Sequence, residues 1–471
     1  MTSPSRSMPS RPMPSRSMPR RPMLRSSVTA RTHAHTPAFP SPTVQSPVPS
    51  TSAPAAIPPT GPLGVVHPRL PWRHTFISLG IHNFRLFAAA HLVAVIALWM
   101  QRIAQDWLVL ELSGSVAAVG VTVALQFLPV LVLGPWGGLM ADRFSKRRLL
   151  QGCAVAAAAC AAALAVLALT GALEVWHVYA IALVLGFVTV LDQPARQVFV
   201  NELVGPVHLR NAISVNSTTF QLGALVGPAV AGWLLTAVGG GWAFAVNAAA
   251  CVLTAAALGA LRRDELVVAP PVPKAKGMLR EAVAYAWRKP TIRWPWAMAG
   301  VVAVFALSLP VLLAAYADHV FSVGAAGYGL LNTMVAVGAL AGAVASARRV
   351  RLSLRTVLLG AGLYGVMLAA ASIAPSLPLF CVLVAASGFC ALMFVTSANQ
   401  LVQTSANVGI RGRVMSLYTM VLVGGQALGG PLMGFLAEHW GAHAALATAG
   451  VVPAFAAAAL AAGLRLRGRG A

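Results

Sequence analysis

The sequence predicts an all-α membrane protein with twelve transmembrane helices in two six-helix bundles, which are related by a parallel pseudo-repeat. Three observations support this fold class. Hydrophobic residues make up 58% of the 471 residues and charged residues only 10%, which is more apolar surface than a water-soluble globular protein needs. The lysines and arginines gather in segments that separate the apolar ones. The second half also repeats features of the first at an offset of 202 residues, such as Gly223 and Gly425.

The bundles are expected at residues 74–261 and 293–464, with a cytoplasmic linker at 262–292 and a basic cytoplasmic tail at 465–471. Each predicted span is near or above the ~20 residues that cross a hydrocarbon core. Pro194 is expected to break or end the fourth helix. The twelve spans are 85–112, 116–140, 149–172, 176–198, 211–238, 241–261, 293–317, 325–347, 354–374, 377–402, 412–438 and 442–464.

The segments outside the bundles have their own signals. Residues 1–73 are rich in Pro, Ser and Arg and contain no acidic residue, so we expect a disordered basic tail. The tail is either a passive extension, an over-long start, or an arm that holds the anionic inner leaflet. In the linker, Pro270, Pro271 and Pro273 indicate an extended stretch, and 277–289 predicts an amphipathic helix on the cytoplasmic interface.

The positive charges indicate the orientation. Apart from Arg102, the lysines and arginines fall in the tails and in segments on one side of the twelve-helix arrangement, while the other side carries acids and histidines. We therefore expect a cell-membrane protein with both termini in the cytoplasm. The net charge of +23 is then a topology signal, and no nucleic-acid partner is expected. The histidines and cysteines lack metal-type spacing, so we expect neither a metal nor a cofactor.

The turn between the second and third helices carries glycines, one carboxylate and four cations. It resembles the signature loop of the major facilitator superfamily, Gly-x-Leu-Ala-Asp-Arg-x-Gly-Arg-Lys-x-x-Leu. Met140 and Ser145 depart from that pattern, and Lys146 replaces Arg. Our hypothesis is that Asp142 latches the cytoplasmic ends of the helices in one state, with a nearby cation such as Arg196 or Arg413 as its partner. The matching residues are Gly138, Ala141, Asp142, Arg143, Arg147 and Leu150.

Other segments extend the resemblance over about residues 82–465. The run 191–204, with Asp192 and Arg196 four residues apart, and the run 99–115 are similar to the transmembrane secretion effector branch, which includes enterobactin-exporter-like proteins. The resemblance implies a major facilitator fold and export of a small organic molecule, with protons as the coupling ion. A Gly-Pro motif similar to that of the superfamily's antiporters is formed by Gly223, Gly227, Pro228 and Gly232.

Proton coupling is assigned to Asp106, tuned by Arg102. These residues are four apart on the first helix, so they share a face and can pair. An ionisable residue inside a span usually faces a cavity or a partner. Many drug–proton antiporters carry an arginine in helix 4, four residues before a glycine; with Gly186 as that glycine, the position here is Ala182. The alternative is that both residues lie at the outer interface, where Arg102 reaches the headgroups.

A substrate site is expected near the midplane, where two rocking bundles meet. For each polar candidate, a hydrogen bond between helices is an equally good explanation. We expect a monomer in membrane lipids with a small-molecule substrate, and no enzyme, because phosphate loops and nucleophile elbows are missing. The alternatives are a proton-coupled importer or uniporter, and a non-transporting sensor or scaffold. The candidates are Gln105, Gln126, Asn216, Gln221, Asn332, Asn399 and Gln426.

Overall fold

The computed structural model describes residues 77–266, 278–347, 353–407 and 410–469, all of which belong to one compact unit, His67–Ala471. For residues 135–143, 278–279, 347 and 465–469 it describes the backbone alone. The predicted tail at 1–73 and the predicted extended stretch at 270–273 lie outside the described residues. Below, the first half means residues 77–266 and the second half residues 278–469.

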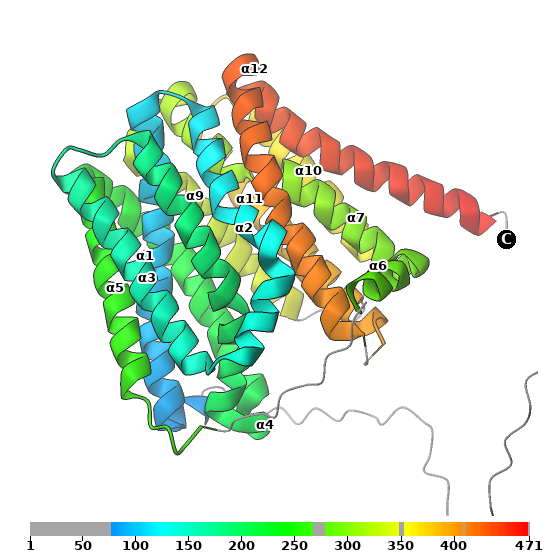
Figure 1. Ribbon diagram of the computed structural model, residues 1–471. Coiled ribbons are helices and arrows are strands. Elements are labelled where there is room, and N and C mark those ends of the chain that lie inside the picture. Colours follow the sequence, from blue (N-terminus) through cyan, green and yellow to red (C-terminus); the bar gives the residue numbers. More distant parts are fainter. Residues whose placement is uncertain (1–76, 267–277, 348–352, 408–409, 470–471) are drawn as a thin grey trace, which may run out of the picture. The chain divides into compact units, whose positions relative to one another are not determined.

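Helices account for nearly all of the described residues, and these residues form no strand, so the all-α prediction is confirmed (Figure 1). The first half contains the short 3-10 helix η2 (Ile77–Gly80), α1 (His82–Ser113), α2 (Val116–Arg143), α3 (Lys146–Leu169), α4 (Val175–Ala237) and α5 (Gly240–Ala260). The second half contains α6 (Met278–Arg288), α7 (Pro290–Phe305), α8 (Leu309–Ala315), the π-helical turn η3 (Tyr316–Val320), α9 (Gly324–Ala347), α10 (Leu354–Ser372), α11 (Leu377–Ser405) and α12 (Arg411–Arg469).

Within the described residues, ten helical segments are long and apolar enough to cross a membrane. Two of them have 63 and 54 residues, and each turns at a glycine with a positive φ, Gly205 (66°) in α4 and Gly441 (84°) in α12. Glycine reaches this backbone region without steric cost. Dividing α4 and α12 at these glycines is consistent with the twelve predicted crossings.

The expected break at Pro194 is wrong. The α4 helix continues through Pro194 and turns only at Gly205, which Pro206 follows. A proline inside a spanning helix is tolerated when neighbouring groups satisfy the freed carbonyl, whereas a residue with positive φ and extended ψ cannot stay helical. The fourth span is therefore longer than 176–198, and the predicted loop before residue 211 is mostly helix.

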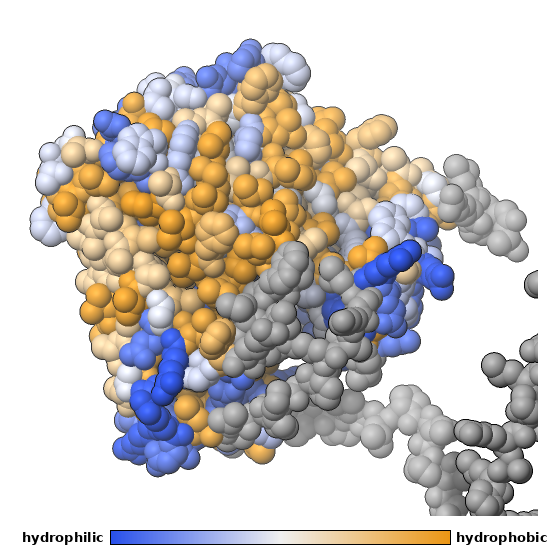
Figure 2. Space-filling model, viewed as in Figure 1, coloured by the Kyte–Doolittle hydropathy of each residue, from blue (hydrophilic) through white to orange (hydrophobic). Residues whose placement is uncertain are grey.

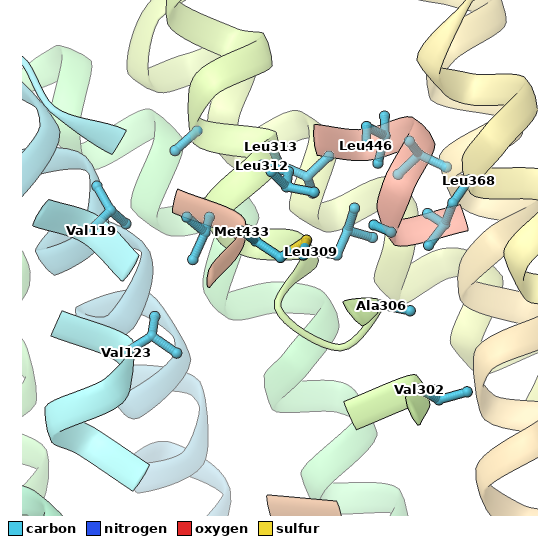
Figure 3. Packing of buried hydrophobic residues seen from close by; sticks show 14 of the residues in the cluster. Val119, Val123, Val302, Ala306, Leu309, Leu312, Leu313, Leu368, Met433 and Leu446 are labelled. Carbon is cyan, nitrogen blue, oxygen red and sulfur yellow. The ribbon is translucent and has the colours of Figure 1, made fainter. Parts of the chain in front are cut away.

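The predicted helix 293–317 is also interrupted. Its chain runs as α7, then residues 306–308, then α8 and η3. The N–H groups of Ala306 and Leu307 both donate to the carbonyl of Val302, at 2.9 Å each, which ends α7. Pro310, with no N–H to donate, opens α8. Figure 3 shows this break among apolar side chains, with Met433 of α12 beside Leu309.

The amphipathic helix predicted at 277–289 is confirmed as α6. Ala282 and Ala286 are fully buried, while Trp287 on another face is 59% exposed. Glu281 pairs with Arg413 of α12 at 3.3 Å, and the Lys289 ammonium donates to the carbonyl of Ser405 at 2.7 Å. These contacts tie α6 to the start of α12 and the end of α11.

Glycines allow close contacts between helix backbones at equivalent positions of the two halves. A Cβ on Gly227 would lie 2.5 Å from the Cβ of Trp99, so α4 touches the α1 backbone closely. Its counterpart at the 202-residue offset, Gly429, would meet the backbone oxygen of Val304 in α7 even more closely. A second pair of equivalent glycines, Gly232 and Gly434, lies at contacts between the two halves. A Cβ on Gly232 would lie 3.1 Å from Gly329 of α9, and a Cβ on Gly434 would lie 2.9 Å from Ala117 of α2.

The outer surface is apolar in the middle. Figure 2 shows orange, hydrophobic residues over the body of the helices and blue, hydrophilic residues toward their ends. Large apolar side chains on this surface include Leu359, 66% exposed, and Phe455, 73% exposed. Patches of this extent are costly in water and suit contact with lipid.

We predict that Gly227→Ala destabilises the protein. The new methyl group has no room between α4 and α1, and overpacking of this kind costs about 1–3 kcal/mol. The measurement is the melting temperature of the purified protein in detergent. The matched control is Gly152→Ala on α3, where a Cβ meets nothing within 4 Å. Equal melting temperatures for the two variants would contradict the packing described here.

Candidate functional site

A cavity of about 350 Å³ lies between the two halves. The first half contributes α1, α2 and α4 to its wall. The second half contributes Leu307 and Ser308 of the break together with α8, α9, α10, α11 and α12. Its volume falls in the range of about 300–1,000 Å³ that is typical of small-molecule pockets.

Two charged side chains, Asp106 and Arg102, line this cavity. These are the two residues to which proton coupling was assigned, and that assignment requires them to face a cavity or a partner. Asp106 is only 5% exposed. Its Oδ2 accepts a hydrogen bond of 3.2 Å from the hydroxyl of Tyr328 on α9, and its Oδ1 is buried without a partner. The Tyr328 ring stacks on Trp107 at 5.9 Å. The hydrogen bond therefore joins the two halves.

Arg102 does not pair with Asp106, although the spacing on α1 allows it. The guanidinium lies over the rings of Trp99, at 5.4 Å, and Phe127 of α2, at 5.6 Å. Within the described residues, it donates no hydrogen bond and forms no ion pair. Cation–π contacts with two rings hold the charge at the cavity wall.

The seven polar candidates separate into three groups. Gln126, Gln221, Asn332 and Gln426 line the central cavity, and Gln126 also lines a smaller chamber. Gln105 is 1% exposed and lines only that chamber, which lies inside the first half. The remaining candidates, Asn216 and Asn399, line neither space.

The sequence analysis missed the aromatic part of the cavity wall. Trp99, Phe127, Phe220 and Tyr364 line it, and Trp99 meets Phe220 edge-on at 5.7 Å. On apolar spans, aromatic residues give no local signal that separates a cavity from lipid. The break at 306–308 was also missed, and Pro310 was the one sequence signal that marked it.

The smaller chamber, of about 150 Å³, lies within the first half and contains the predicted Asp192–Arg196 pair. Arg196 donates to both carboxylate oxygens of Asp192, at 2.7 and 3.0 Å, and also contacts His91 Nδ1 at 3.0 Å. Across the chamber, Asn247 donates to Gln101 at 2.5 Å. These contacts occupy Arg196, one of the two partners suggested for Asp142.

The signature loop is described only in part. Gly138, Asp142 and Arg143 lie where the backbone alone is described. Lys146 pairs with the buried Glu202 of α4 at 3.3 Å. The Arg147 guanidinium donates hydrogen bonds to the carbonyl oxygens of Leu258, at 2.5 Å, and Gly259, both at the end of α5.

Ser145, which departs from the glycine of the signature, has a structural role. It is the N-cap of α3, and its hydroxyl accepts a hydrogen bond of 3.3 Å from the N–H of Arg148. Serine is among the best N-cap residues because it satisfies one of the free N–H groups at a helix start. Serine at this position therefore lacks the backbone freedom of glycine but caps the N-terminus of α3.

At the end of the helices opposite the signature loop, which we call the Glu438 end, hydrogen bonds hold the two halves together. Glu438 of α12 accepts hydrogen bonds from the Ser115 hydroxyl at 2.5 Å and the Ala117 N–H at 3.0 Å. Both donors are at the start of α2, so a carboxylate of one half caps a helix of the other. Below this contact, a Cβ on Gly430 would meet Gly120 at 2.7 Å, which leaves no gap along α2 and α12.

Comparisons with known proteins agree on the class of protein. The sequence profile of a family described as transmembrane secretion effectors matches residues 74–470. The multidrug efflux pump Tap of Mycolicibacterium fortuitum is 29% identical over 355 residues, which are 73% of this chain and 86% of Tap. The enterobactin exporter EntS of Escherichia coli is 27% identical over 369 residues, 75% of this chain and 85% of EntS.

Solved structures share the fold. An inward-facing, unoccupied bacterial homologue of the human lysosomal transporter Spinster superposes with a TM-score of 0.66 at 15% identity, covering 80% of this chain and 95% of the homologue. A POT family transporter in complex with a thioalcohol-conjugated peptide superposes with a TM-score of 0.67 at 12% identity, covering 82% and 98%. The major facilitator fold expected from the sequence is confirmed.

We predict that Glu438→Ala opens the Glu438 end more often. The variant loses two hydrogen bonds between the halves, and each is worth about 1 kcal/mol or less at an exposed site, so the open population should rise several-fold. Spin labels at Leu112 and Ile373, in a variant without the five native cysteines, report the width of this end by pulsed electron resonance. Glu111→Ala, which removes an exposed acid on α1, is the control. An unchanged distance distribution in Glu438→Ala would show that the contact does not hold this end shut.

Proposed function

The chain belongs to the transmembrane secretion effector family of major facilitator transporters, and from this we propose that it exports a small organic molecule by proton antiport. In the proposed cycle, the two halves rock about the central cavity and open it to each side in turn. The family and the named relatives are transporters rather than enzymes. Two of these relatives carry names of efflux proteins, which supports the outward direction.

The proposed orientation follows the charges. The end of the helices with the signature loop, which we call the Lys146 end, carries Lys146, Arg147 and Arg148. The Glu438 end carries Glu111, Glu174 and Glu438. The positive-inside rule favours a cytoplasmic Lys146 end, with both termini on that side of the cell membrane. On this proposal the closed Glu438 end faces outward. We propose a single chain as the working unit.

The hydrogen bond between Asp106 and Tyr328 carries the proposal of proton coupling. It links α1 of the first half to α9 of the second, directly beside the cavity. A hydrogen bond to a charged group contributes about 1.5–3 kcal/mol, against about 0.5–1.5 kcal/mol between neutral groups. Protonation of the carboxylate would therefore weaken the contact and favour separation of the halves at the Glu438 end.

Other groups have smaller parts in the proposal. Gln126, Gln221, Asn332 and Gln426 contact substrate from the cavity wall. Asp142 remains the proposed latch at the cytoplasmic end. Its suggested partners, Arg196 and Arg413, pair with Asp192 and Glu281 in this structure, so the latch requires either an exchange of partners or a different cation.

The first test is transport into everted membrane vesicles, with a panel of hydrophobic and siderophore-like compounds. A proton gradient, acidic inside, should drive accumulation of at least one compound, and an uncoupler should abolish it. Asp106→Asn should reduce gradient-driven accumulation more than about tenfold, because the side chain no longer titrates. Asp318→Asn, at an exposed aspartate of η3, is the control. Gradient-driven export by Asp106→Asn would refute the assignment of the coupling residue.

The second test concerns Tyr328. Tyr328→Phe keeps the ring that stacks on Trp107 but removes the hydroxyl that reaches Asp106. We expect a several-fold slower gradient-driven transport and a shifted dependence on internal pH, since carboxylate and conformation become uncoupled. The control is Tyr316→Phe, another buried tyrosine, whose hydroxyl donates within its own half to the Ser372 carbonyl at 3.3 Å. If both variants kept the wild-type pH profile, the contact would have no part in coupling.

A further inference from the structure

The central cavity offers a ligand one charged group that forms no ion pair or hydrogen bond with the described residues, the guanidinium of Arg102. Arg102 lines the cavity and is partly exposed. Its five N–H groups donate to no residue in the described part of the chain, and the guanidinium makes cation–π contacts with the rings of Trp99 and Phe127. A guanidinium held in this way keeps its planar set of donors free, and such a set fits two oxygens of a carboxylate.

Asp106, the other charged group of the wall, is less available. One of its oxygens accepts the Tyr328 hydroxyl, and the other is buried from the cavity. Arg102 on α1 and Tyr328 on α9 are the described titratable groups that act on Asp106. A ligand that enters from the cavity therefore meets the positive group first, although both residues lie on one face of α1.

The wall around Arg102 is aromatic. Trp99 and Phe220 form an edge-to-face pair with centroids 5.7 Å apart, and the Phe127 ring lies 5.6 Å from the guanidinium. Such ring faces and edges accept a planar aromatic ligand by stacking. The amides of Gln126 and Gln221 line the same region and can bond to polar substituents.

We propose that this cavity selects organic anions with a planar aromatic part, whose carboxylate or similar oxyanion binds Arg102 while the ring packs among Trp99, Phe127 and Phe220. This inference rests on the proposed function, because it names the substrate class of the same cavity. Arg102 then acts as a specificity-determining residue, beside its electrostatic effect on Asp106.

The test compares three ligands of one shape and different charge: 2-naphthoate, 2-naphthamide and 2-naphthylmethylammonium, each tritiated. Binding is measured at pH 7 by scintillation proximity, with the full-length protein in phosphatidylcholine nanodiscs, so that no anionic lipid competes. We expect naphthoate to bind about tenfold or more tightly than either analogue. Equal affinity for the three ligands would overturn the proposal. Preference for the ammonium compound would also overturn it, and would point to Asp106 as the group that ligands meet.

Variants identify the responsible residue. Arg102→Gln should remove the preference for naphthoate but leave the affinity for naphthamide within about twofold, which also shows that the cavity is intact. Arg102→Lys should keep part of the preference, because it retains the charge without the planar fork. Arg85→Gln, an exposed arginine on the same helix outside the cavity, should change nothing. A preference that survives in Arg102→Gln sinks the proposal. If that variant does not fold, a reduced preference in Arg102→Lys supports the proposal and an undiminished preference overturns it.

The same ligands separate this inference from the proposed function. Arg102-dependent binding of naphthoate without gradient-driven accumulation in everted vesicles would support the anion site and count against antiport. Gradient-driven export of other compounds that depends on Asp106, with no preference for naphthoate, would support antiport and refute the anion site.

Discussion

Close approach of helix backbones is the constraint on which the arrangement depends. In a lipid environment no hydrophobic force draws one helix to another, so contact requires small residues that let backbones meet. Here Gly227 and Gly429 set the helices of each half, and Gly232 and Gly434 set the contacts between halves. The cavity is the space that these contacts leave, and Asp106 can reach Tyr328 only because α9 is held near α4 and α1 at that end.

Much of the fold follows from sequence because its causes are local. Apolar spans, the amphipathic α6 and the glycine repeat each show as periodicity or spacing. The break at Gly205 was placed at Pro194 instead, since proline is the stronger local signal, whereas the positive φ of Gly205 depends on how the two parts of α4 pack. The interruption after α7 was hidden for a similar reason, because Ser308 is a single polar residue within an otherwise apolar run.

The site was less predictable, because its contacts join distant parts of the chain. The spacing of Arg102 and Asp106 gives one helix face but does not decide what each side chain touches. Arg102 meets Phe127 of α2, and Asp106 meets Tyr328, 222 positions away in the sequence. Asp192 and Arg196 form the opposite case, in which i, i+4 spacing does produce the pair. Arg196 also lies over the ring of Phe87, at 5.9 Å, so a cation–π contact does not by itself prevent such a pair.

The position of Arg102 has an electrical consequence. A substrate that neutralises this guanidinium would cross the bilayer as an anion, and a cell whose interior is negative pushes anions outward by about 2.3 kcal/mol per charge for each 100 mV. Exchange of such an anion for an entering proton moves two charges in the same electrical sense. The voltage across the membrane would then drive both limbs of the cycle, even where the pH is equal on the two sides.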